Sequence, residues 1–244
     1  MTHLLRSELL KLRSTRTTLG LALGMAALTI FVALASGFSA SKTGLAFLRD
    51  QRDLFGVGGV ATLFAALIGV MSVTSEFRHG TIRPTLLFEP RRTRVILAKL
   101  AASLLTGALF GLLAEGLAFA LGGLVLAIRG IGFVLDAHDV FALVAGTAAA
   151  TLLWAGVGVG LGAIVRSQVG AIIGLFAWLL VAENLLFGLA PKVGRYAPGP
   201  AAQALAGGAQ DHLLRPALGG LVLAAWVVAL VAAGTGLIVR RDID

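Results

Sequence analysis

Long apolar segments alternate with short polar ones along the whole chain. Windows of about 20 residues with few charged side chains can cross a bilayer core as a helix, and six of them can be placed. They are Leu19–Phe38, Phe55–Thr74, Leu100–Ala127, Val140–Val165, Val169–Ala190 and Ala217–Val239. The pattern predicts an all-α integral membrane protein with six transmembrane helices, organised as a single transmembrane domain over residues 1–244.

Composition supports this class. Hydrophobic residues make up 58% of the 244 residues and charged residues 13%, against about 45–50% and 25% in soluble domains. The 32 glycines fit membrane helices, in which small residues let backbones approach closely. The chain has no cysteine, which excludes disulfides, thiolate metal sites and a cysteine nucleophile.

The most basic polar segment is Ser75–Lys99, which we call the island. Its basic residues are Arg78, Arg83, Arg91, Arg92, Arg94 and Lys99. At about 2.5–3.5 kcal/mol for each Arg or Lys at the centre of a membrane helix, burying the island in lipid would cost on the order of 15 kcal/mol or more. The island therefore lies in water.

The positive-inside rule places the island on the cytoplasmic side. With the N-terminus on that side too, 13 of the 20 Lys and Arg are inside: Arg6, Lys11, Arg13, Arg16, the six of the island, Arg166, Arg240 and Arg241. The outer ones are Lys42, Arg49, Arg52, Arg129, Lys192, Arg195 and Arg215. We expect a multi-pass protein of the cell membrane with both termini cytoplasmic. Because this bias explains the net charge of +8, no nucleic-acid partner is expected.

Within the island, the sequence predicts a short helix over Ile82–Phe88. Thr81 is placed to cap it, Pro84 is tolerated in its first turn, and Pro90 stops it. A further helix is expected to begin at Thr93 or Arg94 and to continue into the third span.

The short helix presents three adjacent large apolar side chains, Leu86, Leu87 and Phe88, inside a charged loop. Such a cluster needs a surface that buries it, either the membrane or a partner protein.

Residues 3–17 combine leucines at helical spacing, Leu5, Leu9 and Leu12, with four basic residues. One interpretation is an amphipathic helix that lies in the inner membrane interface against lipid. The alternative is that these charges only orient the first span.

Residues 191–216 form the longest predicted outer loop, and its glycines and prolines break any continuous helix. The loop either lies on the surface or turns back into the outer leaflet as short re-entrant turns.

Several catalytic and nucleotide-binding devices are missing. Ser41-Lys42-Thr43 imitates the end of a Walker A loop, but Ser36 and Ser41 occupy both glycine positions. The four histidines, His3, His79, His138 and His212, lack metal-ligand spacing. We therefore expect no metal, no cofactor and no catalytic residue in this chain.

Four glycines at Gly156, Gly158, Gly160 and Gly162 fall inside a predicted span and predict close helix packing.

Two carboxylates lie within predicted spans. Glu115 stands 15 positions past Leu100, and Glu183 stands 15 positions past Gln168, so both lie about 22 Å deep at about 1.5 Å per residue. Intramembrane acids commonly face a bundle interior or a wet cavity, so both, with Asn184, are candidates for a translocation path. The alternative, which the sequence favours, is a hydrogen-bonded structural role, with Asn184 as the evident neighbour of Glu183.

Two stretches resemble the type-two ABC exporter permease family, the membrane subunits that work with ATPases on separate chains. They are Ser7-Glu8-Leu9-Leu10-Lys11-Leu12-Arg13-Ser14-Thr15-Arg16 and the pattern Glu76-x-Arg78-x-Gly80-Thr81, followed by Pro90-Arg91-Arg92 and Lys99. The six-span layout agrees, and about 35 residues carry specific matches.

The resemblance implies an elbow helix at residues 3–17 and a coupling helix in the island that docks on a cytoplasmic ABC ATPase subunit. The turn Arg166-Ser167-Gln168 would be a second contact, and a second permease subunit, identical or paralogous, would complete the assembly. The coupling residues are expected to be Glu76, Arg78, Gly80, Thr81, Leu86, Leu87, Phe88, Arg91, Arg92 and Arg166.

The sequence thus leads to a non-catalytic permease subunit of an ATP-driven exporter. Two alternatives stay open. A secondary transporter would carry broken spans in matching places of two halves, and an integral membrane enzyme would use Glu115 or Glu183 in catalysis.

Overall fold

The computed structural model describes residues 2–208 and 212–240, which are largely helical and contain no strand in these ranges. Among them, six helical segments are long and apolar enough to cross a membrane: Arg16–Ser39, Leu48–Arg78, Arg92–Arg129, Ala137–Val165, Gln168–Leu189 and Pro216–Arg240. Each coincides with one predicted span. The prediction of an all-α, multi-pass membrane protein is confirmed.

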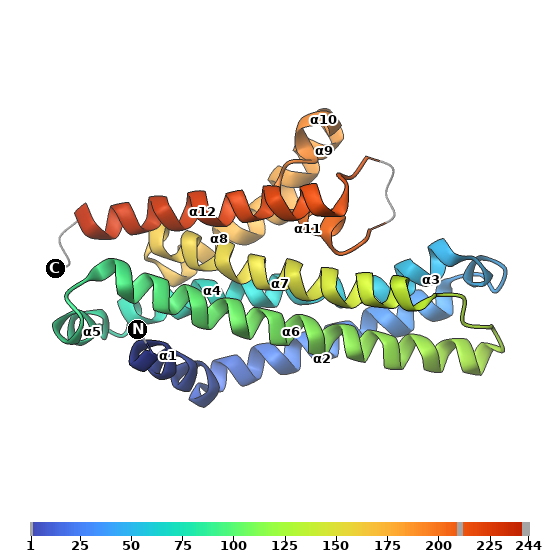
Figure 1. The fold of residues 1–244 in the computed structure, drawn as a ribbon, viewed down its shortest axis with the longest axis horizontal. Helices are drawn as coiled ribbons and strands as arrows, with labels where there is room; N and C mark the ends of the chain where they lie inside the picture. The colour runs from blue at the N-terminus through green and yellow to red at the C-terminus, as the bar shows by residue number, and fades with distance from the viewer. Residues whose placement is uncertain (1, 209–211, 241–244) are drawn as a thin grey trace.

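The helices follow one another in a long bundle (Figure 1). Their bounds are α1 Thr2–Ser14, α2 Arg16–Ser39, α3 Leu48–Phe55, α4 Ala61–Arg78, α5 Ile82–Phe88, α6 Arg92–Arg129, α7 Ala137–Val165, α8 Gln168–Ala177, α9 Glu183–Leu189, α10 Pro191–Gly194, α11 Pro198–Leu205 and α12 Pro216–Arg240. Short 3₁₀ segments cover Gly44–Ala46 and Gly56–Val60, and a π-helical turn covers Trp178–Ala182.

Two of the spans are interrupted, which the sequence did not predict. The second span begins at Leu48, earlier than expected, and the 3₁₀ segment Gly56–Val60 divides it into α3 and α4. In the fifth span the π-helical turn Trp178–Ala182 separates α8 from α9. Single π turns inside α-helices are frequent at functional sites.

Helix α7 forms the centre of the bundle and packs against α4, α6 and α12. Its glycines permit this. A Cβ at Gly158 would overlap the carbonyl oxygen of Ala66, and one at Gly160 would lie 2.6 Å from the Cβ of Leu230. The prediction of close helix packing at these glycines is confirmed.

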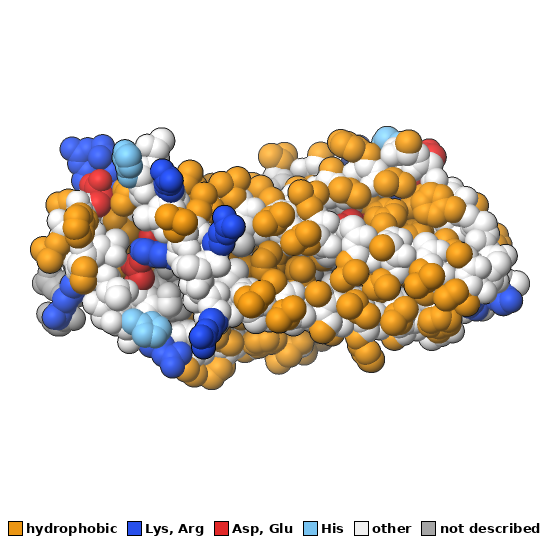
Figure 2. Space-filling model, turned by 90° about the horizontal axis from the view of Figure 1, so that it is seen from below, with side chains coloured by type: hydrophobic (Ala, Val, Ile, Leu, Met, Phe, Trp, Pro, Cys, Tyr) orange, Lys and Arg blue, Asp and Glu red, His pale blue; other side chains and the backbone are white. Residues whose placement is uncertain are grey.

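Both described ends of the chain lie at the same end of the bundle, with α1 and α5, while α3 lies at the opposite end (Figure 1). We call the first the terminal end. On the face in Figure 2, Lys and Arg side chains gather toward the terminal end, and apolar side chains are spread over the rest of the face. This arrangement matches the predicted grouping of the inner charges; of these, Arg241 lies outside the described residues.

The described residues of the loop at 191–216, which are 191–208 and 212–216, include the short helices α10 and α11. Helix α11 packs against α7 and α12, and its residues Pro200, Ala201 and Ala204 are buried. A Cβ at Gly219 of α12 would lie 2.7 Å from the carbonyl oxygen of Ala201. This part of the loop therefore turns back into the protein.

Candidate functional site

The island forms the turn and short helix that its sequence predicts, but the start of the helix is not capped in the way expected. Helix α5 covers Ile82–Phe88 and begins after Thr81, but the Thr81 side chain makes no capping hydrogen bond. Instead, its backbone N–H donates to the carbonyl of Glu76 (3.0 Å), and Gly80 between them has φ of 67°. This is the Schellman end of α4, for which a glycine is the usual left-handed residue. Helix α6 then begins at Arg92, slightly earlier than predicted.

Helix α5 holds its apolar cluster in the open. Ile82 is buried and attaches the helix to the bundle, whereas Leu87 is 83% and Phe88 94% exposed. Leu86 is half-buried. The predicted exposed cluster is present, with Leu87 and Phe88 as its outermost side chains.

Four charged residues from three helices form a network beside the island, which we call the buried network because three of the four, all but Lys11, are buried. Lys99 of α6 donates to Glu8 Oε2 (2.9 Å) and Glu76 Oε1 (2.7 Å). Lys11 of α1 donates to Glu8 Oε1 (2.7 Å) and to the same Oε1 of Glu76 (2.8 Å). Lys99, Glu8 and Glu76 are all nearly inaccessible to solvent. The network contains two acids and two bases, so its formal charge is zero.

This network fixes the N-terminal helix to the bundle, because α1 carries Glu8 and Lys11 while α4 and α6 carry the partners. Burial by itself lowers the pKa of Lys11, but hydrogen bonds and charge attraction from Glu76 and Glu8 outweigh it and raise the pKa above 10.5. Lys11 is therefore positively charged at neutral pH. Glu76 faces inward, so any contribution it makes to coupling passes through α1 and α6.

Two of the predicted coupling arginines bind the end of α12. Arg92 donates to the carbonyl of Ile238 (2.6 Å), and Arg166 donates to the carbonyl of Leu237 (2.8 Å). Cationic donors satisfy the last carbonyls of a helix and complement its dipole. Both arginines thus tie the island and the α7–α8 turn to the C-terminal helix.

The other island arginines lie nearer the surface. Arg78 donates to Gln168 Oε1 (3.1 Å), which joins the island directly to the turn predicted as the second contact. Arg91 is exposed, and Arg94 pairs loosely with Glu89 at 3.7 Å. The terminal end is therefore one connected surface built from α1, the island, the α7–α8 turn and α12.

A second candidate site is a cavity of about 650 Å³ in the part of the bundle away from the terminal end. It lies between the two interrupted spans, with the 3₁₀ segment and α3 on one side and α9 and α11 on the other. Its polar lining is Arg49, Arg52, Asp53, Thr62, Glu183, Asn184 and Gln203. Its size falls within the range of about 300–1,000 Å³ for small-molecule sites.

Glu183 is buried in the wall of this cavity. Its Oε1 accepts hydrogen bonds from Trp178 Nε1 (2.7 Å) and the backbone N–H of Gly199 (2.8 Å). The sequence suggests Asn184 as the neighbour of Glu183 in a hydrogen-bonded role, but the structure shows another arrangement. The Asn184 side chain donates instead to the carbonyls of Leu179 and Leu180. Consecutive helical residues point in different directions, whereas the π-helical turn brings Trp178 over Glu183.

Glu115 lies outside the cavity lining. It is fully buried in α6 beneath Gly58, where a Cβ would overlap its carboxyl group. The Thr147 side chain is a polar neighbour of this carboxyl group. The structure therefore brings Glu183 and Asn184 together at one cavity and leaves Glu115 behind the 3₁₀ segment that forms the cavity wall.

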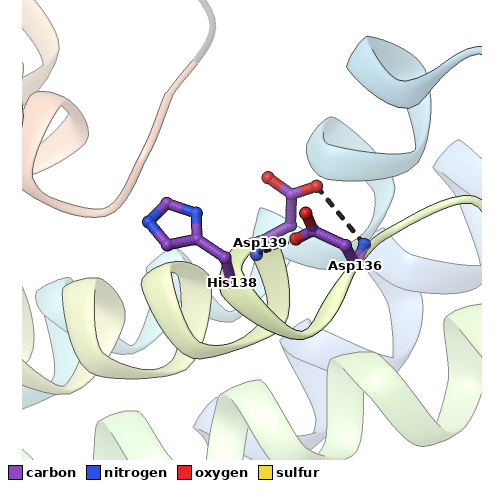
Figure 3. A group of neighbouring side chains, drawn as sticks. All are labelled: Asp136, His138 and Asp139. Atoms are coloured by element: carbon purple, nitrogen blue, oxygen red, sulfur yellow. Dashed lines mark hydrogen bonds between the residues drawn. The ribbon is translucent and has the colours of Figure 1, made fainter.

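Asp136, His138 and Asp139 offer ligand atoms within 4.8 Å of one another at the start of α7 (Figure 3). The two carboxylates have structural partners. The Asp136 carboxylate accepts a hydrogen bond from the Asp139 N–H (2.7 Å), and the Asp139 carboxylate accepts one from the Asp136 N–H. These two reciprocal bonds form a capping box. Asp139 also pairs with Arg52 at 3.2 Å. This cluster acts as a helix cap.

Several residues of the two sites were not among the site residues predicted from the sequence. Glu8 and Lys99 belong to the buried network, and Arg49, Arg52 and Gln203 belong to the cavity. The polar run Arg49–Asp53 was a usable signal, since charges three and four positions apart share one face of a short helix. Glu8 and Lys99 stand in the two stretches that carry the family resemblance, but their pairing could not be predicted because Lys99 lies 91 positions from Glu8 and 23 positions from Glu76.

We compared the chain with known proteins. No protein-family model matches it, and no curated protein sequence matches it.

Proposed function

We propose that the protein is the membrane-spanning permease subunit of an ATP-driven exporter, and that it works with an ATPase on a separate chain. The observation that carries this proposal is the exposed pair Leu87 and Phe88 on α5. Large apolar side chains at the tip of a polar loop, flanked by the exposed Arg83 and Arg91, suit an apolar socket with an acidic rim on a water-soluble partner.

The connections of α5 support a coupling role. The helix lies between α4 and α6, both of which run through the bundle (Figure 1). The 3₁₀ segment before α4 lines the cavity, and α6 carries Glu115 behind that segment. A partner that moves α5 would displace α4, whose Thr62 lines the cavity, and α6, which packs against the 3₁₀ segment of the cavity wall. Nucleotide binding to that partner would then favour one of two arrangements of these helices.

The direct test is co-expression with the ATPase encoded nearest to this chain. We expect the two proteins to co-purify. We also expect ATP to drive uptake of the transported compound into inside-out proteoliposomes only when both proteins are present. An ATPase that neither binds the protein nor depends on it for activity would overturn the proposal.

A second candidate, a secondary transporter, is favoured by one specific observation. The interruptions at Gly56–Val60 and Trp178–Ala182 fall in the second and fifth of six spans, which are matching places of two three-span halves, and residues of both border the same cavity. Such broken helices mark substrate sites in secondary transporters. Transport driven by an ion gradient, without ATP or a partner, would favour this function.

A further inference from the structure

We propose that the cavity is a binding site for a small hydrophobic organic cation, and that the free carboxylate oxygen of Glu183 recognises the positive charge. That this site holds a transported substrate rests on the proposed transport function. The binding itself requires neither ATP nor a partner.

The first support is the fixed orientation of the carboxylate. Trp178 Nε1 and the Gly199 N–H both donate to Oε1, so this oxygen is already used. Oε2 accepts no hydrogen bond from the described residues. A Cβ at position 199 would overlap Oε2, so the glycine leaves the space that this oxygen occupies.

The second support is that Glu183 forms no ion pair with either arginine of the cavity lining, Arg49 or Arg52. Arg52, the cation of α3 nearest to the start of α7, pairs with Asp139 at 3.2 Å. Arg49 and Asp53 are exposed residues of α3 with opposite charges. Among the lining residues of the cavity, Glu183 is therefore the buried charge without a basic partner. A buried carboxylate is costly until a cation accompanies it.

The third support is the apolar part of the lining. Leu143, Trp154, Leu179 and Phe187 contribute to the walls. Aromatic faces attract cations in addition to burying apolar surface. A ligand with its charge spread over an apolar body satisfies both the carboxylate and these walls.

The test compares two ions of nearly the same shape and opposite sign. Tetraphenylphosphonium and tetraphenylborate are titrated separately into the purified full-length protein in detergent, with the change in tryptophan fluorescence and equilibrium dialysis as readouts. We expect the cation to bind saturably and the anion to bind at least tenfold more weakly. Equal binding of both ions, or tighter binding of the anion, would overturn the proposal.

Glu183→Gln is the central variant because glutamine keeps one oxygen for Trp178 and Gly199, while it removes the negative charge and replaces the other oxygen by an NH2 group. We expect it to weaken cation binding at least tenfold. Glu89→Gln makes the same change of charge in the island and should leave binding unchanged. Unchanged cation binding in a folded Glu183→Gln protein would overturn the proposal.

Arg49→Gln keeps the proposal falsifiable if Glu183→Gln does not fold, since it removes a positive charge from the lining without touching Glu183. This variant should bind the cation more tightly and the anion more weakly; the opposite changes would contradict the proposal.

Binding without ATP-driven transport would instead contradict the proposed exporter function alone, and ATP-driven transport without cation binding would contradict the cation site alone.

Discussion

The Nζ atom of Lys99 lies 2.7 Å from Oε1 of Glu76, although the residues stand on different helices and both side chains are buried. Lys99 also binds Glu8, so one ammonium group joins three helices at the terminal end. A charge in such a position is stable only while its partners are present.

Replacement of Lys99 by methionine should therefore destabilise the protein strongly. Removing one partner of a buried ion pair costs about 3–5 kcal/mol because an uncompensated charge remains. We expect this loss in denaturant unfolding of the detergent-solubilised protein. The double variant Lys99→Met/Glu76→Gln restores neutrality and should recover part of the loss; additive losses from the two substitutions would show that the residues do not interact.

The raised pKa of Lys11 predicts a loss of stability in alkaline solution. A lysine whose pKa is raised on folding contributes fully below its ordinary value of 10.5, and the contribution disappears as the pH rises through the higher folded-state value. The wild type should thus be more stable than Lys11→Met at pH 8–10, and the difference should shrink above pH 10.5. Thermal unfolding of both proteins across this range measures it, and a constant difference would contradict the assignment.

The hydrogen bonds from Arg92 predict a local effect at the end of α12. Arg92→Ala removes a charged donor from the carbonyl of Ile238, a loss of about 1.5–3 kcal/mol. Hydrogen exchange should accelerate in the last turn of α12. Arg94→Ala is the control, since its pair with Glu89 is long and partly exposed and contributes at most about 1 kcal/mol. Equal exchange in both variants would refute the capping role.

The glycine contact between α7 and α4 predicts a packing defect. Gly158→Ala places a methyl group against the carbonyl oxygen of Ala66 and should cost about 1–3 kcal/mol through overpacking. Gly236→Ala in α12 meets no atom within 4 Å and should be neutral or slightly stabilising, because alanine favours helix. Comparable unfolding midpoints for the two variants would argue against this helix contact.

The exposed cluster predicts a coupling variant. If α5 docks on an ATPase, Leu87→Glu should abolish transport-linked ATP hydrolysis and leave membrane insertion intact, because Leu87 is 83% exposed and supports no packing. Val134→Glu, an exposed apolar position at the opposite end of the bundle, serves as the control. ATPase stimulation and co-purification are the measurements, and normal coupling in Leu87→Glu would exclude this docking site.

The spans and the island could be predicted because each depends on local composition. Helix α5 occupies the predicted residues, Ile82–Phe88, and all six spans lie where apolar windows indicated. The two interruptions were missed because 3₁₀ and π turns in apolar segments leave no polar signal, and the glycines of Gly56–Val60 are also common in regular membrane helices.

The sequence by itself determined the class of the protein, its number of spans and the grouping of its charges. The physical reason is that unsatisfied peptide groups and charges are costly in lipid, so apolar segments must be helical and basic segments must stay outside. Only the tertiary structure decided which charges meet. Glu8, Glu76 and Lys99 become partners through the packing of three helices. Glu183 lines a cavity between the two interrupted spans, where Trp178 and Gly199 of α11 both donate to one of its oxygens.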